Sequence, residues 1–98
     1  MIIVPQPLVF EWDDANRIKN VKKHNATNEE CEEIFFDPRK KIAKDILHSR
    51  YEDRYILIGE TKKGRILFIV FTIRKTNVRV ISARDLNRKE RILYEKET

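Results

Sequence analysis

The run RYILIGETKKGRILFIVFTI, residues 54–73, decides the fold of this chain. It holds two stretches rich in β-branched and aromatic residues, 54–61 and 65–73, separated by a short polar segment with a glycine at 62–64. Such residues favour strands, and a glycine-containing connection of this length joins two antiparallel strands into a hairpin. Residues 66–71 are apolar at every position, which predicts a central strand covered on both faces.

Further strands are expected on both sides of this hairpin. Residues 41–47, where lysines surround Ile42, are typical of an edge strand. After the hairpin, a turn over 74–77 leads into a strand over 78–83, and a short strand is expected at 10–12. The sheet is therefore predicted to contain three or four antiparallel strands.

Two helices are expected between the short strand and the sheet. Apolar residues recur at helical spacing over 13–24, which predicts the first. The second follows Thr27, which matches a capping box together with Glu30. Cys31 is expected on the buried side of this second helix, and Pro38 stops the chain from continuing it.

A last helix is expected near the end of the chain. Asp85 is predicted to cap it, with Leu86 and Leu93 on its buried side. The predicted fold class is α+β. A short N-terminal strand and two helices pack on a three- to four-stranded antiparallel sheet, with a C-terminal helix, in a single domain over 1–98.

The composition points to an anionic partner. The 98 residues include 21 Lys and Arg against 16 Asp and Glu, giving a net charge of +5 and a pI near 9.5. This balance favours nucleic acid, a membrane surface or an acidic protein, although a solvated basic surface is the plain alternative. The longest apolar run, 66–73, is far shorter than the roughly 20 residues that span a membrane. The single cysteine fits the reducing cytosol.

Arginines near the last strand are candidates for binding phosphate. Arg74 and Arg79 flank the predicted turn, and Arg84 is expected at the start of the last helix. A helix N-terminus disfavours an arginine but favours a bound phosphate, which would pair with the guanidinium. In helical register, Arg88 and Arg91 continue a ridge from Arg84. Salt bridges to nearby acids are the alternative for these arginines.

The two histidines are candidates for proton transfer. His24 ends the lysine-rich first helix and His48 lies in a polar loop, and histidine is readily tuned to titrate near neutral pH. Lys19 and Lys23 share one face of that helix and could contact phosphate, or they could simply be solvated. No carboxylate pair or Cys/His spacing indicates a metal site, so no metal and no cofactor are expected.

Short motifs follow one another in a fixed order over residues 9–95. They are Phe10-Glu11-Trp12-Asp13, Lys19-Asn20, Lys23-His24, Phe36-Asp37-Pro38, His48-Ser49, Arg54-Tyr55, Ile58-Gly59, Gly64-Arg65, Arg79-Val80-Ile81-Ser82-Ala83-Arg84, Arg88, Glu90-Arg91 and Tyr94-Glu95. In this order they resemble the BrnT-type toxins of type II toxin–antitoxin systems. Asn25 stands where that family usually has glycine, and asparagine tolerates the same left-handed backbone.

The resemblance implies a RelE-like fold and a cytoplasmic ribonuclease that shuts down translation. It implies RNA as substrate and a neighbouring-gene antitoxin of the BrnA type, which binds operator DNA and takes the toxin along as co-repressor. In metal-independent cleavage Arg74, Arg79 and Arg84 would hold the phosphate, and His24 or His48 would be acid or base. Lys19, Lys23 and Arg88 would contact the substrate. The alternatives are a basic nucleic-acid-binding module without catalysis and a protein-binding regulatory subunit.

Overall fold

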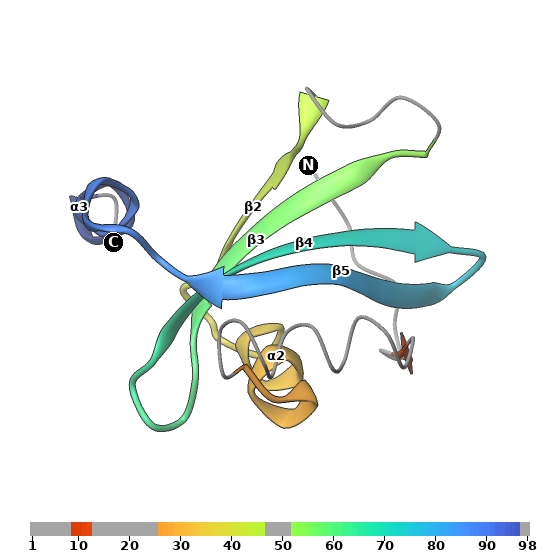
Figure 1. Ribbon diagram of the computed structural model, residues 1–98, viewed down its shortest axis with the longest axis horizontal. Coiled ribbons are helices and arrows are strands. Elements are labelled where there is room, and N and C mark those ends of the chain that lie inside the picture. Colours follow the sequence, from red (N-terminus) through yellow and green to blue (C-terminus); the bar gives the residue numbers. More distant parts are fainter. Residues whose placement is uncertain (1–8, 13–25, 47–51, 97–98) are drawn as a thin grey trace.

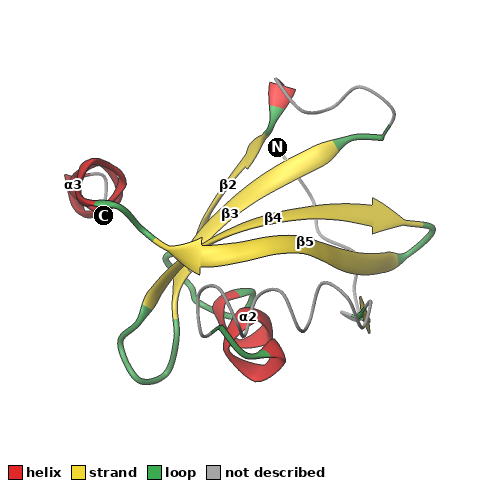
Figure 2. Ribbon diagram, viewed as in Figure 1, coloured by secondary structure: helices red, strands yellow, loops and turns green. Residues whose placement is uncertain are grey.

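A five-stranded sheet forms the body of the fold (Figures 1 and 2). The computed structural model describes residues 9–12, 26–46 and 52–96, so the predicted first helix over 13–24 lies outside the described residues. The strand order is β1-β5-β4-β3-β2. The elements are β1 (Phe10–Glu11), α2 (Asn28–Ile34), β2 (Lys41–Lys44), β3 (Arg54–Glu60), β4 (Ile66–Arg74), β5 (Asn77–Asp85) and α3 (Arg88–Lys96).

The predicted hairpin is confirmed as the β3–β4 pair. Its antiparallel register runs from Arg54 opposite Thr72 to Glu60 opposite Ile66. Gly64 closes the turn with φ +88°, a backbone conformation that glycine adopts without strain. On either side, β2 is an edge strand as predicted, although it ends at Lys44 and not at residue 47, and a tight turn connects β4 to β5.

The sheet is wider than predicted, because the short N-terminal strand is part of it. β1 runs parallel to β5, with Phe10 opposite Val78 and Glu11 opposite Arg79. The Val78 N–H donates to the carbonyl oxygen of Val9 at 2.8 Å, which continues this pairing. The predicted antiparallel sheet is confirmed by the four strands β2 to β5, but the pairing of β1 with them as a fifth, parallel strand was not predicted. A strand of two residues is too short to show an alternation of apolar and polar side chains, so its sequence does not indicate its partner. A parallel partner can also lie far away along the chain.

The main core lies between α2 and the face of the sheet on which α2 lies in Figure 1. Cys31 and Ile34 of the helix are fully buried, and the ring of Phe35 packs edge-on against Phe71 of β4 with centroids 5.1 Å apart. The predicted capping box is confirmed, since the Glu30 N–H donates to the Thr27 hydroxyl at 3.1 Å. Burial raises the pKa of the Cys31 thiol to about 12, which fits the predicted core role.

The opposite face of the sheet is only partly covered. Leu67, Ile69 and Phe71 of β4 are fully buried against the α2 side, but Phe68 and Val70, which point the other way, are half-buried. The expectation that this strand is covered on both faces was wrong. An unbroken apolar run does not distinguish a strand covered twice from one whose second face lines a pocket.

The last helix begins later than predicted. β5 continues to Asp85, and α3 starts at Arg88 with Asn87 as its cap, because the Asn87 side chain accepts from the Glu90 N–H at 2.8 Å. Asp85 is therefore not the cap, and Leu86 precedes the helix instead of forming its buried side. Neither helix in the described part of the chain has the length and apolar character to cross a membrane.

A buried carboxylate joins α3 to the rest of the fold. Asp37 accepts hydrogen bonds from the N–H groups of Arg39 and Glu60, at 2.9 and 2.8 Å, and from the Tyr94 hydroxyl at 3.2 Å. Burial alone would raise the pKa of Asp37, but the donated hydrogen bonds outweigh it and hold this pKa below its ordinary value. Asp37 thus ties the turn after α2 to both β3 and α3.

Candidate functional site

Four arginines lie on the face of the sheet opposite α2. Thr72 of β4 is paired with Arg54 of β3 on one side and with Arg79 of β5 on the other. Paired residues share a face, so both guanidinium groups stand on the same side of the sheet. Arg74, two residues beyond Thr72 on the same strand, also points to this side. We call this surface, which also carries Arg84, the arginine face.

A β-bulge brings Arg84 to the arginine face. The register places Val70 opposite Ser82 but Phe71 opposite Val80, so Ile81 is one residue too many in β5. Arg79 and Arg84 are five positions apart, and strict alternation would put them on opposite faces. Because the bulge absorbs one residue, Arg84 pairs with Phe68 and joins Arg79 on one side.

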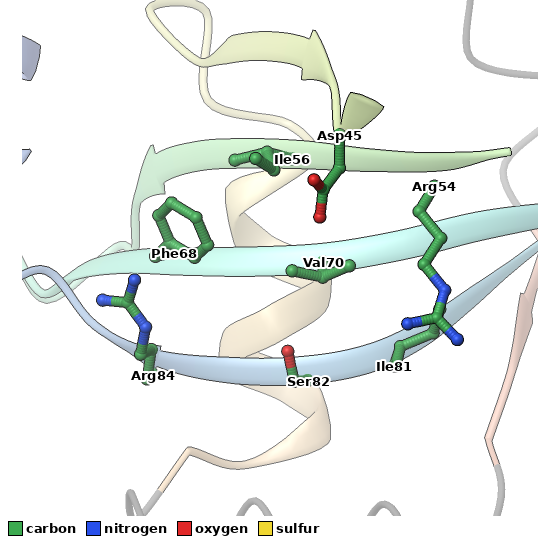
Figure 3. A pocket seen from close by; sticks show the side chains of 8 residues that line it. All are labelled: Asp45, Arg54, Ile56, Phe68, Val70, Ile81, Ser82 and Arg84. Carbon is green, nitrogen blue, oxygen red and sulfur yellow. The ribbon is translucent and has the colours of Figure 1, made fainter. Parts of the chain in front are cut away.

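A pocket of about 440 Å³ opens on the arginine face (Figure 3). Its floor is apolar, and Figure 3 shows Arg54 and Arg84 at opposite ends with α2 behind the sheet. The residues that line it are Asp45, Arg54, Ile56, Phe68, Val70, Ile81, Ser82 and Arg84. The pocket therefore combines an apolar floor with a guanidinium group at each end.

Arg84 is held firmly in this pocket. Its guanidinium lies 4.1 Å from the centre of the Phe68 ring and donates to both carboxylate oxygens of Glu90, at 2.7 and 2.8 Å. These hydrogen bonds keep the pKa of Arg84 above, and the pKa of Glu90 below, the ordinary values. Glu90 also accepts the Asn87 N–H at 3.0 Å, so the cap of α3 and the guanidinium share one carboxylate. The planar guanidinium group of Arg84 is thus already oriented before any ligand binds.

The position of Arg84 corrects the sequence-based prediction. Arg84 lies in β5, whereas Arg88 and Arg91 lie in α3, so the three do not form a ridge along one helix. Arg88 is exposed in the first turn of α3 and does not line the pocket. Arg91 pairs with Glu95 at 3.3 Å. Only Arg84 of this set reaches the pocket.

Two further predicted site residues, Arg74 and Arg79, lie within the described part of the chain. Arg74 lies at the end of β4 with its Nε 3.4 Å from Glu52, and Arg79 is half-buried in β5. The other four, His24, His48, Lys19 and Lys23, lie outside the described residues. Within the described ranges, no three His, Cys, Asp or Glu side chains are grouped to hold a metal ion.

The sequence analysis did not name two charged pocket residues, Arg54 and Asp45, as candidate site residues. Arg54 could have been found, because the hairpin turn fixes the register that puts it opposite Thr72. Asp45 gave no such signal. It follows β2 and is 8% exposed, a burial that depends on segments distant in sequence.

Comparisons with known proteins give one matching family and one similar fold. A family model described as "Ribonuclease toxin, BrnT, of type II toxin-antitoxin system" matches residues 12–90. Among solved structures, the crystal structure of the Brucella abortus ribonuclease toxin BrnT is similar, with a TM-score of 0.61 and 23% sequence identity. The match covers 83% of this chain and 99% of that chain, and it supports the α+β fold. A search of curated proteins finds no match.

Proposed function

Because the chain belongs to the BrnT family of ribonuclease toxins of type II toxin–antitoxin systems, we propose that it is a metal-independent, RelE-like endoribonuclease. Its cleavage of RNA in the cytoplasm inhibits translation. The observation that carries this proposal is the row of Arg54, Thr72 and Arg79 across three strands, with Arg84 on the same face.

The chemistry of RNA cleavage explains why such a row is useful. Without a metal, the 2′-hydroxyl must lose a proton, the phosphate must be stabilised as it gains charge, and the leaving oxygen must be protonated. Arg79 and Arg54 flank one position from two strands, so their guanidinium groups can hold one phosphate from both sides. Arg84 of β5 and Arg74 of β4 lie on opposite sides of this row and extend the surface that can contact the RNA backbone.

The candidates for proton transfer are the histidines that the sequence analysis identified. His24 or His48 would act as acid or base, and Lys19 or Lys23 would assist at the phosphate. Arg88, exposed at the start of α3, contacts the RNA outside the pocket. These assignments follow the family resemblance and the general chemistry of the side chains.

Three acidic side chains that could otherwise attract a cation are paired with arginines. Arg65 binds Glu30 at 3.1 Å and Asp85 at 2.7 Å, and Glu90 is bound by Arg84. These carboxylates fasten α2, β5 and α3 to one another. Their negative charge is therefore already balanced by arginine.

We expect the purified chain to cleave RNA at the same rate with and without EDTA. The reason is that arginine, and not a cation, neutralises the phosphate in this mechanism. The measurement is the rate of loss of a labelled RNA on a gel, with a magnesium-dependent nuclease in parallel to show that chelation is complete. Loss of cleavage in EDTA, restored by added magnesium, would contradict metal independence.

The partner we propose is a BrnA-type antitoxin that covers the arginine face. A toxin with a net charge of +5 attracts a segment with acidic and aromatic side chains, and such charge complementarity speeds association. β2 offers a second contact, because it is an edge strand whose Ala43 and Lys44 are exposed. Operator DNA is reached only through the antitoxin in this complex.

Co-expression with the neighbouring gene is expected to give a stable complex in which RNA cleavage is suppressed. Added salt should slow its assembly, because screening weakens long-range attraction between the charged surfaces. Pull-down and stopped-flow mixing at several salt concentrations measure the two effects. Recovery of the bare chain, together with normal growth when this gene is expressed alone, would instead favour a binding module without catalysis.

A further inference from the structure

The pocket on the arginine face contains one acidic side chain among its basic and apolar ones. Asp45 directly follows β2, and its backbone N–H donates to the carbonyl oxygen of Arg54 at 2.8 Å. This residue is only 8% exposed, yet its carboxylate lines the pocket. In Figure 3 the carboxylate points from the upper edge toward the middle of the pocket, between the ends marked by Arg54 and Arg84.

The arrangement of charges suggests how a nucleotide would enter. The arginines at the two ends attract phosphates, whereas the carboxylate of Asp45 repels them. Between the ends, Ile56 and Val70 offer an apolar floor of the kind that packs against the flat face of a base. A base seated on this floor would therefore present its polar edge to Asp45 and leave its phosphates to the arginines.

The chemistry of a carboxylate decides which base fits. A carboxylate accepts hydrogen bonds through two adjacent oxygens and donates none. Among the four RNA bases, only guanine presents two neighbouring donors, N1–H and the N2 amino group, on its Watson–Crick edge. Adenine and cytosine place an acceptor beside their amino group, and uracil has one donor between two acceptors. Such edges are what proteins read in single-stranded RNA.

We propose that this pocket binds a guanine base and that Asp45 selects it through a two-pronged hydrogen bond. The proposal rests on the proposed function, because it takes RNA as the substrate and assigns the pocket to one of its bases. Arg84, stacked on Phe68 and fixed by Glu90, then marks the end of the pocket where the adjoining phosphate lies.

The decisive variant is Asp45→Asn, which keeps the size of the side chain. A carboxamide offers one acceptor and one donor, so it matches the edges of adenine and cytosine better than that of guanine. The matched control is Asp53→Asn, because Asp53 is an exposed acid paired with Lys44 at 3.2 Å and does not line the pocket. Thermal unfolding of all three proteins shows whether they remain folded.

Two measurements test the proposal independently of each other. Calorimetric titration compares guanosine 3′-monophosphate with adenosine 3′-monophosphate. Sequencing of the fragments of a random RNA gives the base preference at the cleavage position. The wild type and Asp53→Asn should favour guanine in both. Asp45→Asn should bind the guanosine nucleotide about 10-fold more weakly or worse, as expected from losing one bidentate base contact, and its cleavage should shift toward adenine or cytosine.

The possible failures are distinguishable. A wild type that cleaves RNA but binds both nucleotides equally and cuts without base preference overturns the guanine pocket and leaves the ribonuclease intact. A wild type that prefers the guanosine nucleotide and cleaves no RNA overturns the proposed function and supports the pocket. An unchanged preference in a folded Asp45→Asn removes Asp45 as the selecting residue.

Discussion

Replacing Arg79 by alanine is expected to lower the rate of RNA cleavage by about 100- to 1,000-fold without unfolding the protein. Losing one preorganised charge from a transition state typically has an effect of this size. Arg79 is half-buried in β5 and lies across Thr72 from Arg54, so no other residue of its strand can take its place in the row. Arg54→Ala is expected to have a comparable effect, because it removes the other side of the same row.

The matched control for Arg79 is Arg91→Ala. Arg91 is an exposed arginine that pairs with Glu95 on α3, outside the pocket, so its loss should leave the cleavage rate near that of the wild type. Single-turnover cleavage of a labelled RNA gives the rates, and circular dichroism confirms that each variant is folded. If a folded Arg79→Ala protein cleaved RNA at the wild-type rate, the row of Arg54, Thr72 and Arg79 would not be part of the mechanism.

The second large effect is expected on stability. Gly59→Ala should lower the free energy of unfolding by about 1–3 kcal/mol, the usual range for overpacking a filled core. A Cβ at Gly59 would lie 2.9 Å from the Cβ of Ile34 and 2.9 Å from its carbonyl oxygen. Neither atom belongs to the flexible end of a side chain, so α2 itself would have to move away from β3. This movement would expose apolar core surface to water.

Gly64→Ala is the matched control for this effect. Gly64 has no atom within 4 Å of the position that a Cβ would take, so only its positive φ opposes alanine there. We expect a loss of about 1 kcal/mol or less from backbone strain. Urea unfolding of the two variants gives the comparison. If Gly59→Ala unfolded at the same urea concentration as the wild type, the close contact between α2 and β3 would not be a constraint.

Local sequence patterns predicted most of the architecture. The hairpin over 54–73, the edge strand near 41–44 and the capping box at Thr27 each depend on residues that are neighbours along the chain, and all three are confirmed. The place of Cys31 in the core followed from helical spacing and is also confirmed. These features need no knowledge of distant segments, which is why a single sequence carries them.

The site could be predicted only in part. Arg79 was correctly placed beside the last turn. The position of Arg54 opposite Thr72 could have been predicted from the register of the hairpin. Arg84 was assigned to a helix start because Asp85 resembles a cap, but the strand continues through both residues. Pairing with β4 outweighed the local capping preference, since each strand residue gains cross-strand hydrogen bonds and contacts that a cap alone does not provide.

The sequence by itself determined the hairpin, the positive charge and the arginines that carry it. Only the tertiary structure decided which of those arginines share a face. The reason is the bulge at Ile81, which inserts one residue between Arg79 and Arg84 and so reverses the alternation after it. The place of Asp45 in the pocket was decided in the same way, because the other residues that line the pocket come from β3, β4 and β5, which only the assembled sheet brings together. Bulges and enclosed side chains depend on partners distant in sequence, and no local pattern specifies them.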